Sequence, residues 1–316
     1  MRNSGKPELP SPSLPLPSLP RWRGRVRGEG TGMPATTAGM TAELRMRLTV
    51  TTWNINSVRL RINSVARLIK AVRPDVLCLQ ETKCPDDRFP LKRFKRLGYE
   101  HMALNGQKGY HGVVVLSRLP FDRFDIQLFC GKSDCRHVSA VFGERAGLRD
   151  PITVHNLYVP AGGDTPDPEV NPKFAHKLAF LDEMRNCATL RCANGSRMIL
   201  LGDLNVAPLE HDVWSHKQML RVVSHTPIEC EKLVAAQKTG DWVDAMRMLI
   251  PEPTKLYTWW SYRSVDWQAA DKGRRLDHIW VAPALADRVA DLSVLRNSRA
   301  WLRPSDHVPV TTTLEL

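Results

Sequence analysis

Apolar positions from residue 46 onward follow two alternating patterns. Short runs of apolar and β-branched residues, typical of strands, alternate with segments in which apolar residues recur every three or four positions, as in helices. The predicted strands cover 47–54, 75–80, 112–117, 137–143, 152–159, 198–203, 276–282 and 308–315. The predicted helices cover 60–72, 90–97, 173–191, 229–238 and 242–249. This order predicts an α/β fold in which sheets are covered by helices.

Residues 1–45 have a different character. Seven prolines interrupt serine, leucine and glycine there without a helix or strand period, so we expect this segment to be disordered. It also lacks the continuous apolar core of a signal peptide. Met46 begins the first strand pattern directly. We therefore predict one folded domain over 46–316, preceded by an extension that is dispensable or that lies before a true start at Met46.

Length and charge narrow the class of protein. The chain has 316 residues, enough for one large domain or two small ones, and no apolar run approaches the length of a membrane span. The formal net charge is +12, and most of it lies beyond residue 45. A basic body around a set of carboxylates suggests a polyanionic partner. The alternative is that the excess of lysine and arginine only aids solubility.

The cysteines argue against a zinc site and against disulfides. There are seven of them, an odd number, and none of their spacings forms Cys-x-x-Cys. Cys78 lies inside an apolar strand pattern and is expected to be a buried thiol. We expect a reducing cytoplasm.

Polar side chains collect where the predicted strands end. They are Asn54, Glu81, Asp203, Asn205, Asp277, Asp306 and His307. Magnesium takes oxygen ligands and keeps several waters, so one or two carboxylates suffice to hold it. Glu81 alone could equally be a helix-capping or surface residue. Together, these positions predict a metal-dependent phosphodiesterase.

Two of these positions suggest acid–base chemistry. On an extended backbone Asp203 and Asn205 would face the same way, which makes Asp203 a candidate general base beside an orienting amide. A turn in which both side chains bond their own backbone is the alternative. His307 can change charge near neutral pH, with Asp306 as an acidic neighbour, although pairing of adjacent residues requires a bend.

Three further segments carry candidate contacts. Tyr158, at a strand end, can bond a phosphate or leaving oxygen, or can simply pack with its hydroxyl at the rim. The segment 257–263 holds four aromatic residues and an arginine, so core packing, base stacking and a slot for an extrahelical sugar all remain open. The segment 105–110 mixes glycines with donors, and fits either a phosphate contact or a hairpin turn.

Six stretches together resemble a known family. They are Trp53-Asn54-Ile55-Asn56, Leu79-Gln80-Glu81-Thr82-Lys83, Gly106-Gln107-Lys108-Gly109, Leu201-Gly202-Asp203-Leu204-Asn205, Leu276-Asp277-His278 and Ser305-Asp306-His307. Each is weak alone, but in this order the region from Met46 to the end is similar to exonuclease III, the class II apurinic/apyrimidinic (AP) endonucleases of the endonuclease/exonuclease/phosphatase superfamily. The resemblance implies a four-layered α/β sandwich, with two mixed, antiparallel-rich sheets packed face to face, flanked by helices, and an active site at one edge.

The resemblance also implies roles for single residues. Glu81 would bind Mg2+ or Mn2+, supported by Asn54 and Asp306. Asp203 would activate the attacking water, and Asn205 would orient the substrate or that water. The remaining roles are phosphate contact for Tyr158 and His307, site support for Asp277, phosphate binding for Arg136, DNA contact for Lys83 and Lys108, and lining of an abasic pocket for Trp259 and Trp260.

One position departs from the family pattern. The family commonly reads Gly-Leu-Arg-Ile-Asp where this chain reads Gly273-Arg274-Arg275-Leu276-Asp277. Arg274 therefore replaces an apolar residue expected beside the flipped sugar. The chemistry is unaffected, but the selectivity of the pocket is in question, since a cation there would favour phosphate over a neutral sugar.

We predict a monomeric, cytoplasmic hydrolase of base excision repair that binds double-stranded DNA with abasic sites or 3′ ends. It would cleave 5′ to abasic sites and remove nucleotides or blocking groups from 3′ ends, as an exodeoxyribonuclease III. One alternative is a superfamily phosphatase acting on lipid or inositol phosphates, which the segment 80–83 and the basic body disfavour. The other is a catalytically silent DNA-binding relative, which the complete set of carboxylates disfavours.

Overall fold

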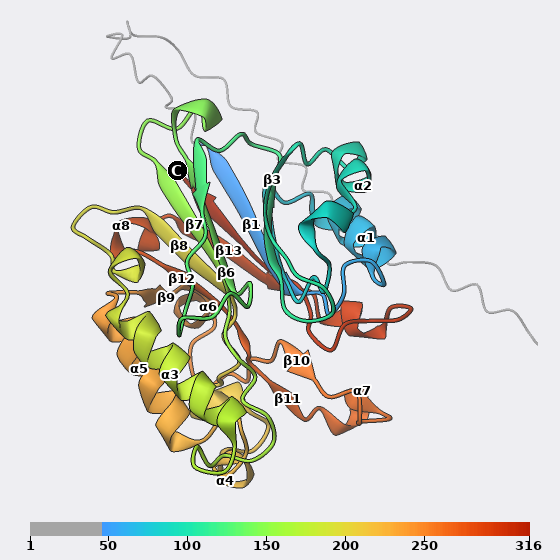
Figure 1. The fold of residues 1–316 in the computed structure, drawn as a ribbon, viewed down its shortest axis with the longest axis vertical. Coiled ribbons are helices and arrows are strands. Elements are labelled where there is room, and N and C mark those ends of the chain that lie inside the picture. The colour runs from blue at the N-terminus through green and yellow to red at the C-terminus, as the bar shows by residue number, and fades with distance from the viewer. Residues whose placement is uncertain (1–45) are drawn as a thin grey trace, which may run out of the picture. The chain divides into compact units, whose positions relative to one another are not determined.

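The computed structural model describes residues 46–316, and the predictions for 1–45 lie outside them (Figure 1). Two six-stranded sheets form the centre. The first has the order β13 (Val289–Val294), β14 (Val310–Glu315), β1 (Arg47–Asn54), β2 (Val76–Gln80), β4 (Val113–Ser117) and β3 (His101–Asn105). The second has the order β5 (Arg123–Asp125), β6 (His137–Phe142), β7 (Ile152–Tyr158), β8 (Met198–Asp203), β12 (Asp277–Val281) and β9 (Val243–Asp244). A two-stranded ribbon joins β10 (Trp259–Trp260) to β11 (Gly273–Arg274).

The two sheets pack face to face through one shared core. Alternate residues of both sheets, such as Val50 of β1 and Val154 of β7, belong to the same buried cluster. Only β1–β2 and β7–β8 are parallel pairs, and the other pairs in these two sheets are antiparallel. The strands read as nearly continuous apolar runs because both of their faces are covered.

Helices cover the outer faces of the sheets. Helices α1 (Ile62–Val72) and α2 (Leu91–Arg96) pack on the first sheet through residues such as Leu68 and Phe94. Helices α3 (Pro172–Asn186) and α5 (Pro227–Thr239) pack on each other and on the second sheet. Figure 1 shows the two helix pairs on opposite sides of the sheets. The four-layered α/β sandwich is therefore confirmed.

Short helices occupy the connections. They are α4 (His216–Met219), α6 (Ala245–Leu249), α7 (Trp267–Ala270) and α8 (Pro283–Ala286). None of the helices in residues 46–316 is both long and apolar enough to cross a bilayer. The seven cysteines, all of which lie in this range, are free, and Cys78 is buried as predicted.

Every predicted strand and helix is present, with some bounds shifted. The helix predicted over 173–191 ends at Asn186 and is followed by a 3-10 turn. The helix predicted over 242–249 begins only at Ala245, because the Asp244 side chain caps it by accepting from two backbone N–H groups. The prediction missed β3, β5, β9, β10, β11 and β13, which lie at sheet edges or in the small ribbon. Strand β5 is exposed at all three residues, so it lacks the apolar pattern that marks a strand.

Candidate active site

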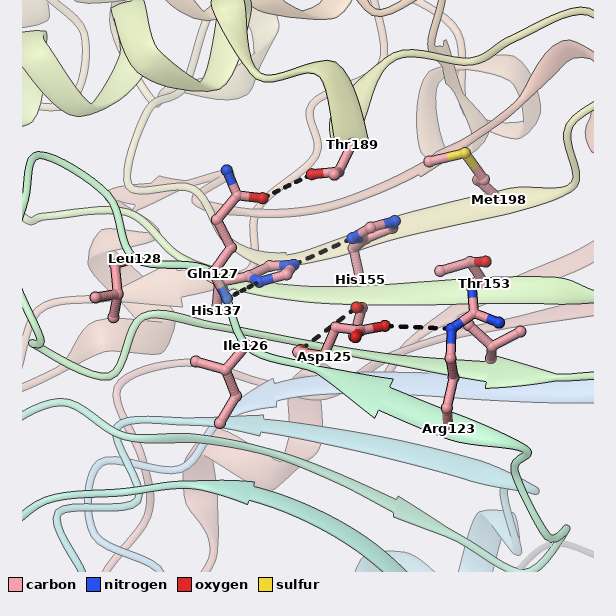
Figure 2. Close-up of a pocket in the computed structure, with 12 residues that line it drawn as sticks. Arg123, Asp125, Ile126, Gln127, Leu128, His137, Thr153, His155, Thr189 and Met198 are labelled. Carbon is pink, nitrogen blue, oxygen red and sulfur yellow. Dashed lines mark hydrogen bonds and ion pairs between the residues drawn. The ribbon is translucent and has the colours of Figure 1, made fainter.

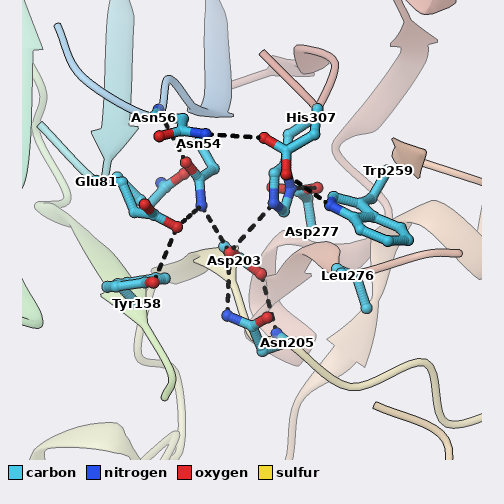
Figure 3. Close-up of polar contacts among 12 residues, drawn as sticks. Asn54, Asn56, Glu81, Tyr158, Asp203, Asn205, Trp259, Leu276, Asp277 and His307 are labelled. Atoms are coloured by element: carbon cyan, nitrogen blue, oxygen red, sulfur yellow. Dashed lines mark hydrogen bonds and ion pairs between the residues drawn. The ribbon is translucent and has the colours of Figure 1, made fainter. Parts of the chain in front are cut away.

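Strand ends from both sheets meet at one edge of the sandwich. The register pairs Asp203 of β8 with Tyr158 of β7 on one side and with Asp277 of β12 on the other. In the first sheet, Asn54 ends β1 and Glu81 directly follows β2. His307 precedes β14. Figure 3 shows these side chains converging from their separate strands, which the sequence prediction required.

Asp203 is the centre of this group. Its Oδ2 accepts hydrogen bonds from Nδ2 of Asn54 at 2.8 Å and from Nδ2 of Asn205 at 3.1 Å. The same oxygen lies 3.6 Å from Nε2 of His307. Burial raises the pKa of Asp203 to about 7, although the nearby His307 charge opposes that shift. Asp203 is therefore a carboxylate that can take up a proton near neutral pH.

His307 is held in its charged form. Its Nδ1 donates to Oδ2 of the fully buried Asp277 at 2.8 Å. Burial would lower the pKa of His307, but Asp277 and Asp203 outweigh it and raise the pKa to about 10. The acid that positions His307 is Asp277 and not the adjacent Asp306. Asp306 instead accepts from Nε1 of Trp259 at 3.0 Å.

Asn205 reaches Asp203 by a different route from the one predicted. The strand ends at Asp203, and Asn205 has a positive φ of 55°. Its backbone N–H donates to Oδ1 of Asp203 at 3.0 Å, and its side chain also donates to the carbonyl of Val159 at 2.9 Å. The two side chains therefore meet across a turn and not along an extended strand.

Glu81 and Tyr158 form the other side of the site. Oε1 of Glu81 accepts from Nδ2 of Asn54 and from the Tyr158 hydroxyl, both at 2.9 Å, and Oε2 lies 2.8 Å from Nζ of Lys83. Burial opposes ionisation of Glu81, but Lys83 and Asn54 keep its pKa below the usual value. Burial raises the pKa of Tyr158 well above its ordinary value, so its hydroxyl remains a donor.

The oxygen donors fit a hard divalent cation. Glu81, Asp203 and Asp306 line one cavity of about 400 Å³, and the amide of Asn54 links the first two. Carboxylate and amide oxygens are the ligands that magnesium and manganese prefer. Within residues 46–316, one cluster of three His, Cys, Asp or Glu residues has metal-ligand spacing, namely Asp203, Asp277 and His307. A protonated imidazole has no lone pair for a metal, so we assign that trio to proton chemistry.

The predicted DNA contacts are distributed unevenly around this cavity. Trp259 and Arg274 line it, and Lys83 lies beside Glu81. Trp260 is only 1% exposed, so it serves mainly as packing. Lys108 is exposed on the turn that follows β3.

Arg136 does not present its charge to the cavity. It is buried, pairs with Asp134, and contacts Nε2 of His111 at 3.0 Å. Its guanidinium also lies 4.9 Å from the centre of the Tyr158 ring. In this structure Arg136 therefore packs against Tyr158, and its predicted phosphate contact stays a prediction.

The prediction gave no role to two residues of the site, although Asn56 lies in one of the six stretches that carry the resemblance. Asn56 accepts from Nζ of Lys83 at 2.6 Å and donates to Asp306 at 3.3 Å. Lys177 of α3 is fully buried, pairs with Glu229 of α5, and donates to the Asn205 carbonyl at 2.7 Å. A lysine among the apolar positions of a helix was the only available sign of this second contact.

A second cavity, of about 520 Å³, lies over the second sheet (Figure 2). Two buried histidines line it, with Nε2 of His137 lying 3.1 Å from Nδ1 of His155. Burial lowers the pKa of His155 to about 4. This cavity lacks the converging carboxylates of the first, so it carries no comparable chemistry.

Comparisons with known proteins agree with this geometry. The model of the Endonuclease/Exonuclease/phosphatase family matches residues 51–307. The chain is 30% identical over 275 residues to exodeoxyribonuclease III of Haemophilus influenzae, covering 82% of this chain and 96% of that protein.

Solved structures give the same result. An AP endonuclease from Archaeoglobus fulgidus superposes with a TM-score of 0.77 and 29% identity, covering 85% of this chain and 100% of that one. The 3′-5′ exonuclease NExo from Neisseria meningitidis superposes with a TM-score of 0.74 and 31% identity, covering 85% of this chain and 100% of that one. A structure of NExo described as a 3′ phosphatase bound to a product DNA hairpin gives the same values. The predicted resemblance and enzyme class, a phosphodiester hydrolase, are confirmed. The chain belongs to the endonuclease/exonuclease/phosphatase family.

Proposed function

We propose that this protein is a metal-dependent DNA phosphodiesterase of the exodeoxyribonuclease III type. It would cleave 5′ to abasic sites and remove nucleotides or blocking groups from 3′ ends. The observation that carries the proposal is the convergence of Glu81, Asp203 and His307 on one cavity. The relatives named exodeoxyribonuclease III, AP endonuclease and 3′-5′ exonuclease support the choice of DNA as substrate.

Asp203 would act as the general base. Two amides, from Asn54 and Asn205, fix its carboxylate, so that the lone pair available for a proton has a defined direction. A base whose pKa lies near the working pH combines a useful unprotonated fraction with real basicity. Asp203 would take a proton from a water molecule while the oxygen of that water attacks phosphorus, in line with the departing 3′ oxygen.

His307 and Tyr158 would stabilise the charge that develops on the phosphate. The bond to Asp277 leaves Nε2 of His307 as a charged donor directed at the same space as Asp203. The Tyr158 hydroxyl, which donates to Glu81, would approach the phosphate from the Glu81 side. Fixed donors of this kind need no reorganisation when charge forms, which is why they lower the barrier.

Glu81 and Asn54, with Asp306 on the same cavity, would hold a magnesium or manganese ion. Such an ion polarises a phosphate and stabilises a leaving oxygen. Lys83 and Asn56 connect Glu81 to Asp306 through hydrogen bonds and an ion pair, so they would keep both carboxylates in place.

The remaining features fit a DNA partner and a single chain. We propose that the protein acts on DNA as a monomer. The net charge of +12 gives the favourable electrostatics that DNA binding requires. Seven free thiols fit the reducing cytoplasm.

A cleavage assay tests the proposal. Duplex oligonucleotides with one abasic site, or with a recessed 3′ end, are incubated with the protein in Mg2+ and in excess chelator. We expect incision 5′ to the abasic site and loss of 3′ residues only with the metal. Cleavage of a phosphoinositide with no action on DNA would favour the lipid phosphatase alternative. DNA binding without cleavage of either duplex would favour the silent relative.

A further inference from the structure

Arg274 lies at the boundary between two cavities. It belongs to β11 and is paired in register with Trp259 of β10. Its guanidinium carbon lies 4.8 Å from the centre of the Trp259 ring. The side chain lines the active cavity that holds Asp203, and it also lines a neighbouring cavity of about 570 Å³.

The neighbouring cavity is cationic. Arg263, Lys272 and Arg274 line it together with three tryptophans, and no acidic residue within 46–316 is among its lining residues. It shares Trp259, Arg263 and Arg274 with the active cavity, so the two cavities adjoin at these residues. Because this cavity has no acidic lining residue, its positive charge favours an anionic group on this side of the junction.

Arg274 has hydrogen-bonding capacity left for such a group. Its Nη1 donates to the Val223 carbonyl at 3.1 Å and to Oγ of Ser224 at 2.9 Å. Its Nε is buried and finds no acceptor in the described part of the chain. The side chain is half-buried, and an Nε–H that is shielded from water without a partner is costly unless an anion or another acceptor approaches it.

Substrates of the proposed reaction differ at this position. Hydrolysis that leaves a 3′-hydroxyl breaks the bond from phosphorus to the upstream O3′. In an internal linkage the phosphorus also carries the O5′ of the next sugar. At an abasic site this next sugar is a neutral group without a base. In a 3′-terminal phosphate a free oxygen takes that place, and the group carries a charge of about −1.5 to −2 at pH 7, as in other phosphomonoesters.

Resting on the proposed function, we infer that Arg274 is a specificity residue that favours DNA ending in a 3′-phosphate over DNA with an abasic site. The guanidinium would pair with the additional anionic oxygen of the terminal phosphate. Where a neutral sugar occupies the same space, the cation would be covered without compensation.

The chemical step is the same hydrolysis with a different product. The oxygen of water bonds to phosphorus, and its proton passes to Asp203. The bond from phosphorus to O3′ breaks, and O3′ gains a proton to become the 3′-hydroxyl. Inorganic phosphate leaves in place of a 5′-phosphorylated strand, and no oxidant or second substrate is required.

The test compares three duplexes of one sequence, ending in a 3′-phosphate, ending in a 3′-hydroxyl, or containing an abasic site. Single-turnover rates in Mg2+ are measured for the wild type, Arg274→Leu and Arg274→Lys. The matched control is Arg123→Leu, which replaces an exposed arginine at the cavity lined by His137 and His155. We expect Arg274→Leu to lower the ratio of phosphate release to abasic cleavage by about tenfold, while Arg274→Lys and Arg123→Leu keep most of it.

Binding provides a second readout that does not depend on turnover. In chelator, the wild type should bind the 3′-phosphate end more tightly than the 3′-hydroxyl end, and Arg274→Leu should lose that difference. If the leucine variant does not fold, Arg274→Gln, which keeps donors but loses the charge, should show the same loss. An unchanged ratio, or an equal loss on all three duplexes, overturns the inference. Failure of the wild type on every duplex overturns the proposed function instead.

Discussion

Two histidines of this protein are buried to the same extent, yet their surroundings are opposite. His307 and His155 are each 4% exposed. His307 lies between Asp277 and Asp203, and its pKa is raised to about 10. His155 contacts another histidine, and burial lowers its pKa to about 4. Burial alone thus gives a neutral structural group, and buried carboxylates are needed to turn a histidine into a charged, functional one.

The hydrogen bonds around His155 follow from this neutrality. The backbone N–H of Gln127 donates to Nδ1 of His137 at 3.2 Å, which places the proton of His137 on Nε2. That proton is donated to Nδ1 of His155, so His155 in turn carries its proton on Nε2. This chain of donors contains no ionised group, and the Nε2–H of His155 at its end finds no acceptor within the described residues. The histidine cavity is larger than the active cavity, so size does not identify the functional site here.

The largest effect is expected from removing the base. Asp203→Asn keeps the shape of the side chain but removes the proton acceptor, so single-turnover cleavage of duplex DNA in Mg2+ should fall by up to about 10⁴-fold. Asp125→Asn makes the same change at the histidine cavity and should leave the rate near that of the wild type. Near-normal cleavage by the Asp203 variant would show that another group activates the water.

A smaller loss is expected from removing the support of His307. Asp277→Asn removes the carboxylate that contributes most to its raised pKa, so His307 should lose its proton at lower pH than in the wild type. Loss of one charged donor should cost about 10²–10³-fold in rate at neutral pH. The rate should also decline on the alkaline side at a lower pH than the wild-type rate does. If the alkaline decline of the rate occurred at the same pH in the variant as in the wild type, Asp277 would not be the residue that keeps His307 protonated.

These comparisons bear on what the sequence could predict. The main strands were recognisable because both faces of each are buried, so their apolar runs are nearly continuous. Edge strands such as β5 were not, since exposure removes that pattern. The polar residues predicted at strand ends do lie together, because strands of both sheets begin or end at one edge of the sandwich, and their roles stay predictions.

Details that depend on distant partners were not predictable. Arg136 is held by contacts with Asp134, His111 and Tyr158 and is not among the residues that line the cavity. Lys177 supports Asn205 only because Glu229 of another helix neutralises it. The pattern of a single segment contains neither relationship, since both depend on how separate elements pack.

The smallest effect is expected at the other histidine. His155→Gln should change the cleavage rate by less than about twofold, because the cavity around His155 is separate from the carboxylates of the active site. It should instead lower the free energy of unfolding by about 1–3 kcal/mol, if the Nε2–H of His137 is left without a good acceptor. The matched variant His307→Gln should lose most activity. Denaturant unfolding and single-turnover kinetics on both variants measure these effects side by side.

The most direct measurement is the protonation state of His307 and His155 in the metal-free protein. It is observed by NMR of ¹⁵N-labelled imidazoles, and the two glutamine variants assign the signals. Because the pKa of His307 is raised to about 10, its ring should stay doubly protonated at neutral and mildly alkaline pH. Because the pKa of His155 is lowered to about 4, its ring should be neutral under the same conditions, with the proton on Nε2. A neutral His307 at neutral pH, or a charged His155, would contradict the account.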